Sequence, residues 1–282
     1  MLYIAALMTV HNRRDKTLRC VRALYDCPLP DGYALDVYMT DDGSTDGTAE
    51  AVKERFPAVK VLQGDGDLYW NRGMINSWQA AAAERSYDFY LWLNDDTYLV
   101  PAALETLLSA SGTLGGEAIV VGATASSSGD ETTYSGRREG RMLAPDGTLQ
   151  RCDSFNGNIV LVPQRVFERV GMLDPFFRHS LGDLDYGLRA AGQGIGAWLA
   201  PKTLGRCDRG PLPVWCSPQT PLTKRFRTLY SPLGCHPGEL FRYEKRHYGF
   251  LLALKHWFTV HLRAVSPKVW AKLKKDENSH SK

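Results

Sequence analysis

FYLWLNDDT, at positions 89–97, joins five apolar residues directly to two adjacent aspartates. A run of this length is typical of a strand that is buried on both faces of a parallel sheet. Asp95 and Asp96 follow at once, and neighbouring carboxylates repel each other unless a cation offsets their charge. Mg²⁺ and Mn²⁺ prefer such oxygen ligands and fill their remaining positions with phosphate oxygens and water. The stretch therefore predicts a strand that ends at a divalent metal site. The alternative is a solvated turn that caps a helix beginning near Pro101.

Short apolar runs alternate with amphipathic stretches before this strand. Alternation of this kind predicts right-handed crossovers and a mainly parallel sheet, so the expected fold class is α/β. Ligands of such sheets bind beyond the carboxyl ends of the strands. The expected strands are 3–10, 35–40, 59–63 and 89–93, and the expected helices are 16–26, 48–55 and 74–85.

The second half of the chain is less regular. Residues 125–148 are rich in Ser, Gly, Thr and Arg, which predicts a long surface excursion or a hairpin. Residues 201–237 carry many prolines and are expected to form an irregular loop. The remaining expected elements are strands at 158–162 and 195–199 and helices at 164–170, 183–191 and within 239–275.

Composition narrows the functional classes. The 282 residues carry 34 basic and 31 acidic side chains, a formal net charge of +3, which gives no reason to expect nucleic-acid binding. The six cysteines contain no close pair of the kind that ligates zinc. The apolar run at 2–8 follows no basic segment and is too short to span a bilayer. We therefore expect a buried first strand and a cytoplasmic protein with reduced thiols.

Polar side chains follow the first two expected strands. His11, Asn12 and Arg13 come after the first, and Asp41 and Asp42 come after the second, ahead of the turn GSTDG. Helix capping explains one acidic or hydroxyl residue at such a turn. A carboxylate that recognises a base N–H or a ribose hydroxyl explains two aspartates ahead of it, and we favour this interpretation at a strand end.

The glycine-rich segment 64–74 precedes the third expected helix. Its glycines beside Asn71 and Arg72 suit close approach of the backbone and of a guanidinium group to an anion. We expect Tyr69 and Trp70, in the same segment, to be core residues.

A second acidic pair, Asp183 and Asp185, lies at the start of an expected helix. Residues two apart do not share a helix face, so one carboxylate can face a cleft while the other caps the helix or pairs with Arg189. A carboxylate at a cleft is a candidate general base for a hydroxyl group. The preference of acidic residues for helix N-termini explains both aspartates as well.

Together these motifs resemble family 2 glycosyltransferases, which are inverting enzymes with the GT-A fold. The resemblance covers residues 3–201 and rests on TVHNR at 9–13, DDGSTDGT at 41–48, LNDDT at 93–97 and a block at 155–189 ending in GDLDYGLR. It implies a mostly parallel central sheet flanked by helices. The implied domains are a catalytic domain at 1–205, with a donor half at 1–100 and an acceptor half at 150–205, and a helical extension at 206–282.

The resemblance also implies a role for each site residue. Asp96 would bind the Mn²⁺ or Mg²⁺ ion that bridges the diphosphate, and Asp95 would contact the ribose or the donor sugar. Asp183 falls on the position of the catalytic base, with Asp185 and His179 in reserve. The nucleotide and donor would be held by His11, Asn12, Arg13, Asp41, Asp42, Asn71 and Arg72.

Two positions depart from the family pattern. Asn94 stands where the acidic motif usually begins with aspartate, which affects the expected metal ligands. Gly182 stands where many members have glutamate, which affects the surroundings of the expected base.

The implied reaction moves a hexosyl or deoxyhexosyl group, rhamnosyl among them, from a UDP- or dTDP-sugar to a hydroxyl of a glycan or lipid-linked acceptor. Bacterial surface polysaccharide synthesis is the expected setting. Asp183 would deprotonate the acceptor, while the metal and Arg72 stabilise the departing diphosphate in a single inverting displacement. Two alternatives stay open: a pyrophosphorylase-like nucleotidyltransferase, although residues 11–14 lack its usual glycine-rich loop, and a non-enzymatic binding protein.

The tail at 250–275 combines apolar and aromatic residues with Lys255, Arg263, Lys268, Lys272, Lys274 and Lys275. A basic and aromatic helical stretch suits peripheral contact with the anionic inner face of a cytoplasmic membrane. Packing of the aromatic residues on the catalytic domain, with the lysines in solvent, explains the pattern equally well.

Overall fold

The computed structural model describes residues 1–210 and 213–270 and divides the chain into two compact units. The first unit comprises Met1–Pro175 and Gly182–Arg209, and the second comprises Phe176–Leu181 and Gly210–Lys282. The first unit buries two apolar clusters, one on each face of its sheet, and the second unit buries a smaller cluster of its own.

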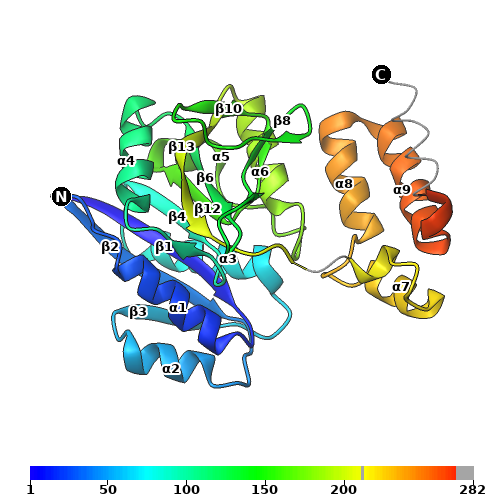
Figure 1. Ribbon diagram of the computed structural model, residues 1–282, viewed down its shortest axis with the longest axis horizontal. Helices are drawn as coiled ribbons and strands as arrows, with labels where there is room; N and C mark the ends of the chain where they lie inside the picture. Colours follow the sequence, from blue (N-terminus) through cyan, green and yellow to red (C-terminus); the bar gives the residue numbers. More distant parts are fainter. Residues whose placement is uncertain (211–212, 271–282) are drawn as a thin grey trace. The chain divides into compact units, whose positions relative to one another are not determined.

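A ten-stranded mixed sheet forms the centre of the first unit (Figure 1). Its strands are β1 (Leu2–Val10), β2 (Tyr33–Asp41), β3 (Val59–Gln63), β4 (Phe89–Leu93), β5 (Tyr98–Leu99), β6 (Ile119–Ala125), β7 (Thr132–Tyr134), β10 (Gln150–Cys152), β12 (Ile159–Pro163) and β13 (Ala197–Arg206). Along the sheet they follow the order β10-β13-β6-β12-β4-β1-β2-β3, with β5 beside β13 and β7 beside β6. β1 is parallel to both of its neighbours, β2 and β4, so the loops that follow these three strands meet at one edge.

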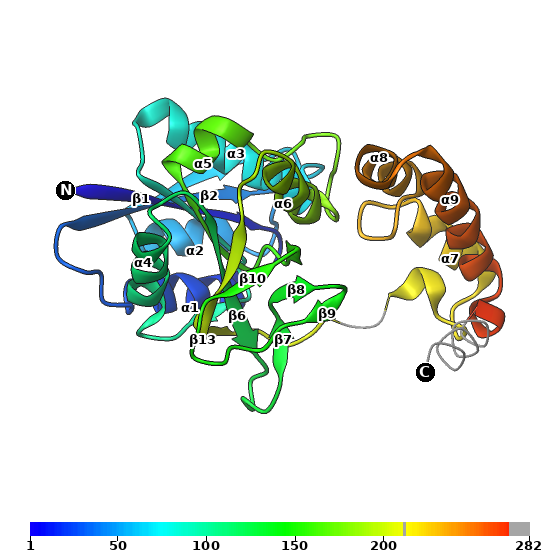
Figure 2. The same ribbon diagram turned by 90° about the horizontal axis from the view of Figure 1, so that it is seen from above.

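Helices cover both faces of this sheet (Figure 2). One face carries α1 (Arg14–Tyr25), α2 (Thr48–Arg55) and α4 (Ala103–Thr113), and the other carries α3 (Tyr69–Glu84), α5 (Gln164–Val170) and α6 (Gly182–Gly192). Successive side chains of a strand point to opposite faces. In β1, Ile4 and Met8 therefore pack toward the first group of helices, and Ala5 and Leu7 pack toward the second. The predicted α/β class, with a mostly parallel sheet flanked by helices, is confirmed.

Several predicted elements have the observed bounds, among them β3, β4, α2 and α5. The hairpin expected within 125–148 is formed by β8 (Gly136–Arg138) and β9 (Arg141–Met142), which pair antiparallel and join β11 (Ser154–Phe155) in a small second sheet. Its two-residue turn, Glu139 and Gly140, has positive φ at both positions (51° and 75°), as the twist of a tight hairpin requires.

The prediction of an irregular loop over 201–237 is partly wrong. β13 continues through Arg206, and α7 (Leu222–Leu229) begins directly after Pro221. Proline is compatible with a helix start because the first helical N–H groups have no intrahelical acceptor. The proline density of this segment therefore marks a helix boundary as well as a loop.

The second unit is helical, as predicted for the C-terminal region. After the short 3₁₀ turn Val214–Cys216 it contains α7, α8 (Pro237–Tyr248) and α9 (Phe250–Val265), whose small core is formed by Trp215, Leu229, Val260 and Ala264. No helix within the described part of the chain is long and apolar enough to cross a membrane. Lys272, Lys274 and Lys275 lie outside the described residues.

An aromatic cluster joins α3 to the sheet. Trp78 is completely buried and packs against Tyr90, Trp92 and Tyr186, with ring centroids 5.2, 5.6 and 5.9 Å away. These contacts link α3, β4 and α6. The cluster therefore supports the elements whose ends carry the candidate site residues.

Trp78→Ala should lower the free energy of unfolding of the first unit by about 3–5 kcal/mol, the usual cost of emptying a buried Trp site. Urea unfolding followed by circular dichroism measures it. Tyr25→Ala is the control, because Tyr25 is 39% exposed and stacks on Phe56, so a loss of about 1 kcal/mol is expected. Equal losses in the two variants would contradict this view of the core.

Candidate functional site

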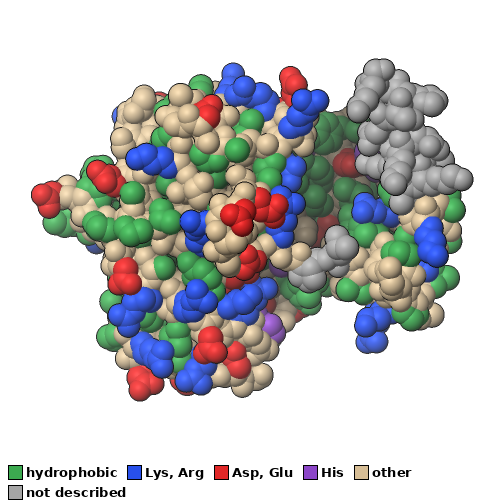
Figure 3. All heavy atoms as spheres, in the orientation of Figure 1, with side chains coloured by type: hydrophobic (Ala, Val, Ile, Leu, Met, Phe, Trp, Pro, Cys, Tyr) green, Lys and Arg blue, Asp and Glu red, His purple; other side chains and the backbone are tan. Residues whose placement is uncertain are grey.

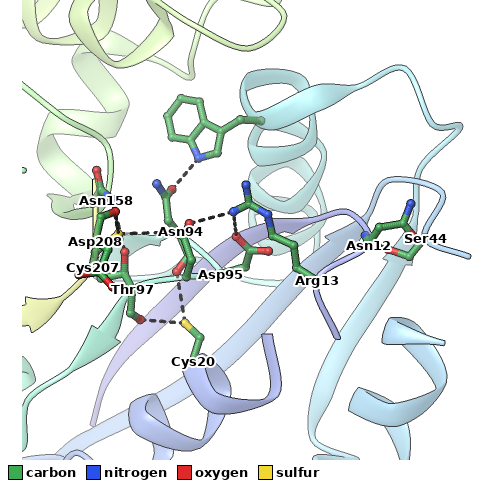
Figure 4. Close-up of polar contacts among 12 residues, drawn as sticks. Asn12, Arg13, Cys20, Ser44, Asn94, Asp95, Thr97, Asn158, Cys207 and Asp208 are labelled. Atoms are coloured by element: carbon green, nitrogen blue, oxygen red, sulfur yellow. Dashed lines mark hydrogen bonds and ion pairs between the residues drawn. The ribbon is translucent and has the colours of Figure 1, made fainter. Parts of the chain in front are cut away.

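The two adjacent aspartates lie at the carboxyl end of β4, where Arg13 from the loop after β1 meets them (Figure 4). Arg13 Nη1 donates to Asp95 Oδ1 at 3.1 Å and to Asp96 Oδ2 at 2.9 Å. Burial raises the pKa of Asp95 to about 7, an effect that the charge of Arg13 opposes and that of Asp96 adds to. One guanidinium group thus contacts both carboxyl groups.

The donor set at this strand end fits a divalent ion that is bound together with a phosphate. Asp95 Oδ2 is buried and accepts no hydrogen bond from the described residues. Within residues 1–210 and 213–270, no three His, Cys, Asp or Glu side chains form a metal cage. Mg²⁺ needs only one or two protein carboxylates when phosphate oxygens and water complete its shell. Asp95 and Asp96 therefore suit a site that the substrate completes.

Asn94 is held by Trp70. The indole Nε1 donates to Asn94 Oδ1 at 2.7 Å, and the ring packs edge-on against Trp92 with centroids 6.3 Å apart. Trp70 is half-buried and packs against the core, and it is also a donor to the acidic motif. An amide at position 94 accepts this hydrogen bond without adding a third negative charge beside Asp95 and Asp96. This contact gives a physical reason for the departure at position 94.

The same indole leads to the candidate base. A Cβ at Gly157 would lie 2.7 Å from Trp70 Cζ2, so only glycine lets the ring approach this backbone. The N–H groups of Gly157 and Leu184 donate to the Asp183 carboxylate, each at 2.9 Å. Contacts through Trp70 and Gly157 therefore connect the motif after β4 with the start of α6.

Asp183 and Asp185 have different surroundings, as the sequence predicts. Burial raises the pKa of Asp183, and the two backbone N–H groups lower it in part. Asp185 is completely buried and pairs with Arg189 Nε at 2.8 Å, while Arg189 also donates to the carbonyl groups of Val170 and Met172. Asp185 thus anchors α6 on the segment after α5. The Asp183 carboxyl thus combines a raised pKa with hydrogen bonds accepted from two backbone N–H groups, which suits a candidate base.

Steric exclusion explains the glycine at position 182. A Cβ at this position would lie 1.8 Å from Asn71 Oδ1. Asn71 is completely buried and donates to the Asp174 carbonyl at 2.9 Å, and Arg72 Nε donates to the Pro175 carbonyl at 2.9 Å. Asn71 therefore occupies space that a larger residue at 182 would need. The structure places Asn71 inside the protein, between the starts of α3 and α6, and Arg72 beside it on the 174–175 backbone.

Asp42 holds the turn that precedes α3. Its Oδ1 accepts hydrogen bonds from the N–H groups of Gly66 at 2.9 Å and Leu68 at 3.2 Å, and its Oδ2 accepts one from Tyr69 at 2.8 Å. The side chain is 3% exposed. These contacts resemble capping, but of a distant helix and not of the local turn. Nucleoside recognition by Asp42 stays a prediction.

The neighbouring residues shape the same sheet edge. Asp41 Oδ1 accepts the Ser44 N–H at 2.8 Å, and His11 Nδ1 lies 2.6 Å from the Asp42 carbonyl oxygen. Asn12 Oδ1 accepts the Thr45 N–H at 2.7 Å, which ties the loop after β1 to the loop after β2. An open cavity of about 420 Å³ adjoins these loops, and its lining residues are Asn12, Arg13, Arg14, Asp15, Lys16 and Asp46.

His179, in contrast, belongs to the second unit through the segment Phe176–Leu181. Two cysteines that the sequence did not mark as site residues lie at the acidic strand end. The Cys207 thiol is 3.6 Å from Asp96 Oδ1, and the Cys20 thiol donates to the carbonyl groups of Asn94 and Thr97. The positions of Cys20 and Cys207 in the sequence do not predict these contacts, because the contacts join segments that are far apart along the chain.

The chain was compared with known proteins. The model of the family described as glycosyl transferase family 2 matches residues 5–172, which is more than half of the chain. No curated protein matches the chain significantly. Among the solved structures of similar fold are three of S. aureus TarS. S. aureus TarS has a TM-score of 0.54 and 12% identity, with 89% of this chain and 44% of TarS covered.

The other two structures are of a shorter piece of the same protein. S. aureus TarS 1–349 in complex with UDP has a TM-score of 0.50 and 14% identity, with 75% of this chain and 61% of that one covered. S. aureus TarS 1–349 alone has a TM-score of 0.51 and 12% identity, with 90% and 71% covered. This chain therefore spans less than half of the longest of the three. Together with the family match, the likeness confirms the predicted GT-A type of fold.

Trp70→Phe keeps a ring beside Gly157 and removes the N–H that Asn94 accepts. We expect any reaction catalysed at this site to slow by about three- to tenfold, the usual value of one hydrogen bond, with the melting temperature little changed. Trp78→Phe is the matched control, because the buried indole of Trp78 makes no hydrogen bond to the acidic motif. Slowing of the same size in both variants would contradict a specific role for the Trp70 N–H.

Proposed function

This chain belongs to glycosyl transferase family 2, and we propose that it moves a hexosyl or deoxyhexosyl group from a UDP- or dTDP-sugar to an acceptor hydroxyl. The observation that supports this reaction most directly is the connection of two acidic sites through Trp70 and Gly157. One site is a carboxylate pair suited to a metal-bound diphosphate. The other is a carboxylate with a raised pKa.

The acceptor that we propose is a hydroxyl of a glycan or lipid-linked glycan in bacterial surface polysaccharide synthesis, on the cytoplasmic side. The likeness to a TarS structure in complex with UDP favours UDP as the nucleotide. The family match favours sugar transfer over a pyrophosphorylase-like nucleotidyl transfer and over a role in binding alone.

The proposed chemistry is one displacement. Asp183 accepts the proton of the acceptor hydroxyl while the oxygen of that hydroxyl bonds to the anomeric carbon. The bond from that carbon to the diphosphate oxygen breaks on the opposite face, so the configuration inverts and the nucleoside diphosphate leaves with the electron pair. Arg13 contacts both aspartates after β4, and Arg13 and Arg72 would offset the charge of the departing group.

A divalent ion would be held by Asp96, with Asp95 directed toward the ribose or donor sugar. When bound, Mn²⁺ or Mg²⁺ supplies positive charge to the diphosphate oxygens. His11, Asn12, Asp41 and Asp42 would order the loops around the nucleoside. Among the reserve bases, Asp185 is the weaker candidate because its carboxylate is paired with Arg189.

Asp183→Asn keeps the shape of the side chain and removes its basicity. We expect the turnover number at saturating donor and acceptor to fall by about 10²–10⁴-fold, with affinity for the nucleoside diphosphate retained. Asp185→Asn is the matched control, and it should lower the melting temperature while keeping most turnover, because it weakens a buried pair with Arg189. The reverse pattern would assign the base to Asp185, and two active variants would point to His179.

The pH profile gives a second test of the base. The reactive form of Asp183 is the carboxylate, so kcat/KM should fall as the pH drops through its pKa in the free enzyme. Because burial raises that pKa, this acid limb should lie above the value near 3.9 of an exposed aspartate. The limb should be missing from the residual activity of Asp183→Asn. An unchanged limb in that variant would assign the titration to another group.

Metal dependence tests the site after β4. EDTA should abolish transfer, and added Mn²⁺ or Mg²⁺ should restore it. Asp96→Ala should lose most activity, about 10²-fold or more, since one ligand of a substrate-completed site is gone. Its circular dichroism spectrum should match that of the unchanged protein. Full turnover by the EDTA-treated protein would mean that Arg13, and not a metal ion, offsets the charge of the departing diphosphate.

A further inference from the structure

Helix α9 exposes an apolar face. Its residues Ala253, Val260 and Ala264 are buried in the second unit, as expected for a packed helix. On a different face lies a row of large apolar side chains spaced three and four residues apart, so that they align along the helix. We name this row the apolar stripe; its members are Leu251, Leu254, Phe258, Leu262 and Val265, and each is exposed.

The stripe is unusual for a surface helix in water. Leu251 is 80% exposed and Phe258 is 60% exposed. A helix that packs by one face normally carries polar residues on the other. Here only part of the remaining surface is polar, with Lys255 next to the stripe and Thr259 and Arg263 farther round the helix. Contiguous exposed apolar surface of this kind marks a site of interaction.

The stretch that contains the stripe exposes charge of one sign. In residues 213–270 the acidic side chains are Glu239 and Glu244, and both are buried, the first paired with Arg178 and the second bonded to His256. The basic residues of the same stretch are Lys224, Arg225, Arg227, Arg242, Lys245, Arg246, Lys255, Arg263 and Lys268. The described part of this stretch thus presents positive charge to solvent without exposed carboxylates.

The first unit is different. Figure 3 shows Lys, Arg, Asp and Glu side chains mixed over the visible face of the α/β unit. Positive charge beside apolar residues is therefore a property of the helical unit and not of the chain as a whole, whose formal net charge is only +3.

We propose that the apolar stripe of α9 inserts into the surface of an anionic lipid bilayer, with the surrounding Lys and Arg side chains on the headgroups. Amphipathic helices that lie in a membrane surface combine these two features: Leu and Phe on one side, and Lys or Arg beside them. Anionic headgroups attract the basic residues at a distance, and apolar contact then holds the helix. The helix lies on the bilayer and does not cross it.

Charge distinguishes this occupant from a second copy of the chain. Two stripes packed together would bring the basic residues of both copies, Lys255 and Lys268 among them, near each other, and like charges repel. An anionic bilayer offers the opposite charge over a large area. Lipid binding needs neither donor nor acceptor, so the proposal stands apart from the proposed sugar transfer.

The test is cosedimentation of the full chain with vesicles. Vesicles of phosphatidylcholine with about 30% phosphatidylglycerol should retain the protein, and pure phosphatidylcholine should not. Raising the salt from about 0.1 M to about 0.5 M should weaken retention, because the Debye length shortens. Leu251→Ser/Phe258→Ser should lower the fraction bound by about tenfold or more, since both side chains lose their apolar contact.

The matched control is Leu222→Ser/Leu233→Ser, which removes two exposed leucines of the same unit that lie outside the stripe. It should bind like the unchanged protein, and all variants should keep their melting temperature. Binding of neither vesicle type would overturn the proposal, as would equal loss in both double variants. Self-association without lipid, seen by sedimentation equilibrium and removed by Leu251→Ser/Phe258→Ser, would assign the stripe to a second copy.

Discussion

Two adjacent carboxylates at the end of a buried strand impose the constraint on which the first unit depends. Asp95 and Asp96 follow β4 directly, and their mutual repulsion must be offset by a cation from elsewhere in the chain. The strand order meets this need, because β1 lies beside β4 in parallel and its following loop carries Arg13 to both aspartates. The parallel pairing of β1 with β4 therefore places positive charge beside the two aspartates. The same edge receives the loop after β2 and the turn before α3, which Asp42 ties together.

The two departures from the family pattern are explained by neighbours in space. Asn94 accepts a hydrogen bond from the indole N–H of Trp70. The side chain of Asn71 fills the space that a side chain at position 182 would need. In each case one member of the pair lies in segment 69–74 and the other lies in an acidic motif. The start of α3 thus contacts both the strand end after β4 and the start of α6. Substitutions at these positions should be coupled, because paired residues do not contribute independently.

Sequence pattern predicted the regular elements and the strand-end location of the site residues. β4 is a short apolar run bounded by polar residues, and its bounds follow from that contrast. The buried strand β6 did not stand out, because Gly122 and Thr124 interrupt its apolar run. α3 begins earlier than its apolar spacing suggests, at Tyr69, whose N–H is bound by Asp42 from a different strand. Contacts of this kind, like the bond from Trp70 to Asn94, join distant segments and leave no periodic trace.

The two separate cores have a thermodynamic consequence. A single free energy of unfolding describes a chain only when it unfolds in one cooperative step, and chains with more than one unit commonly do not. The first unit buries large clusters on both faces of its sheet, whereas the second rests on Trp215, Leu229, Val260 and Ala264 with their partly buried neighbours. The helical unit is therefore expected to have the lower intrinsic stability. A calorimetric trace of this protein should be read as two transitions, each reporting on the substitutions made in its own unit.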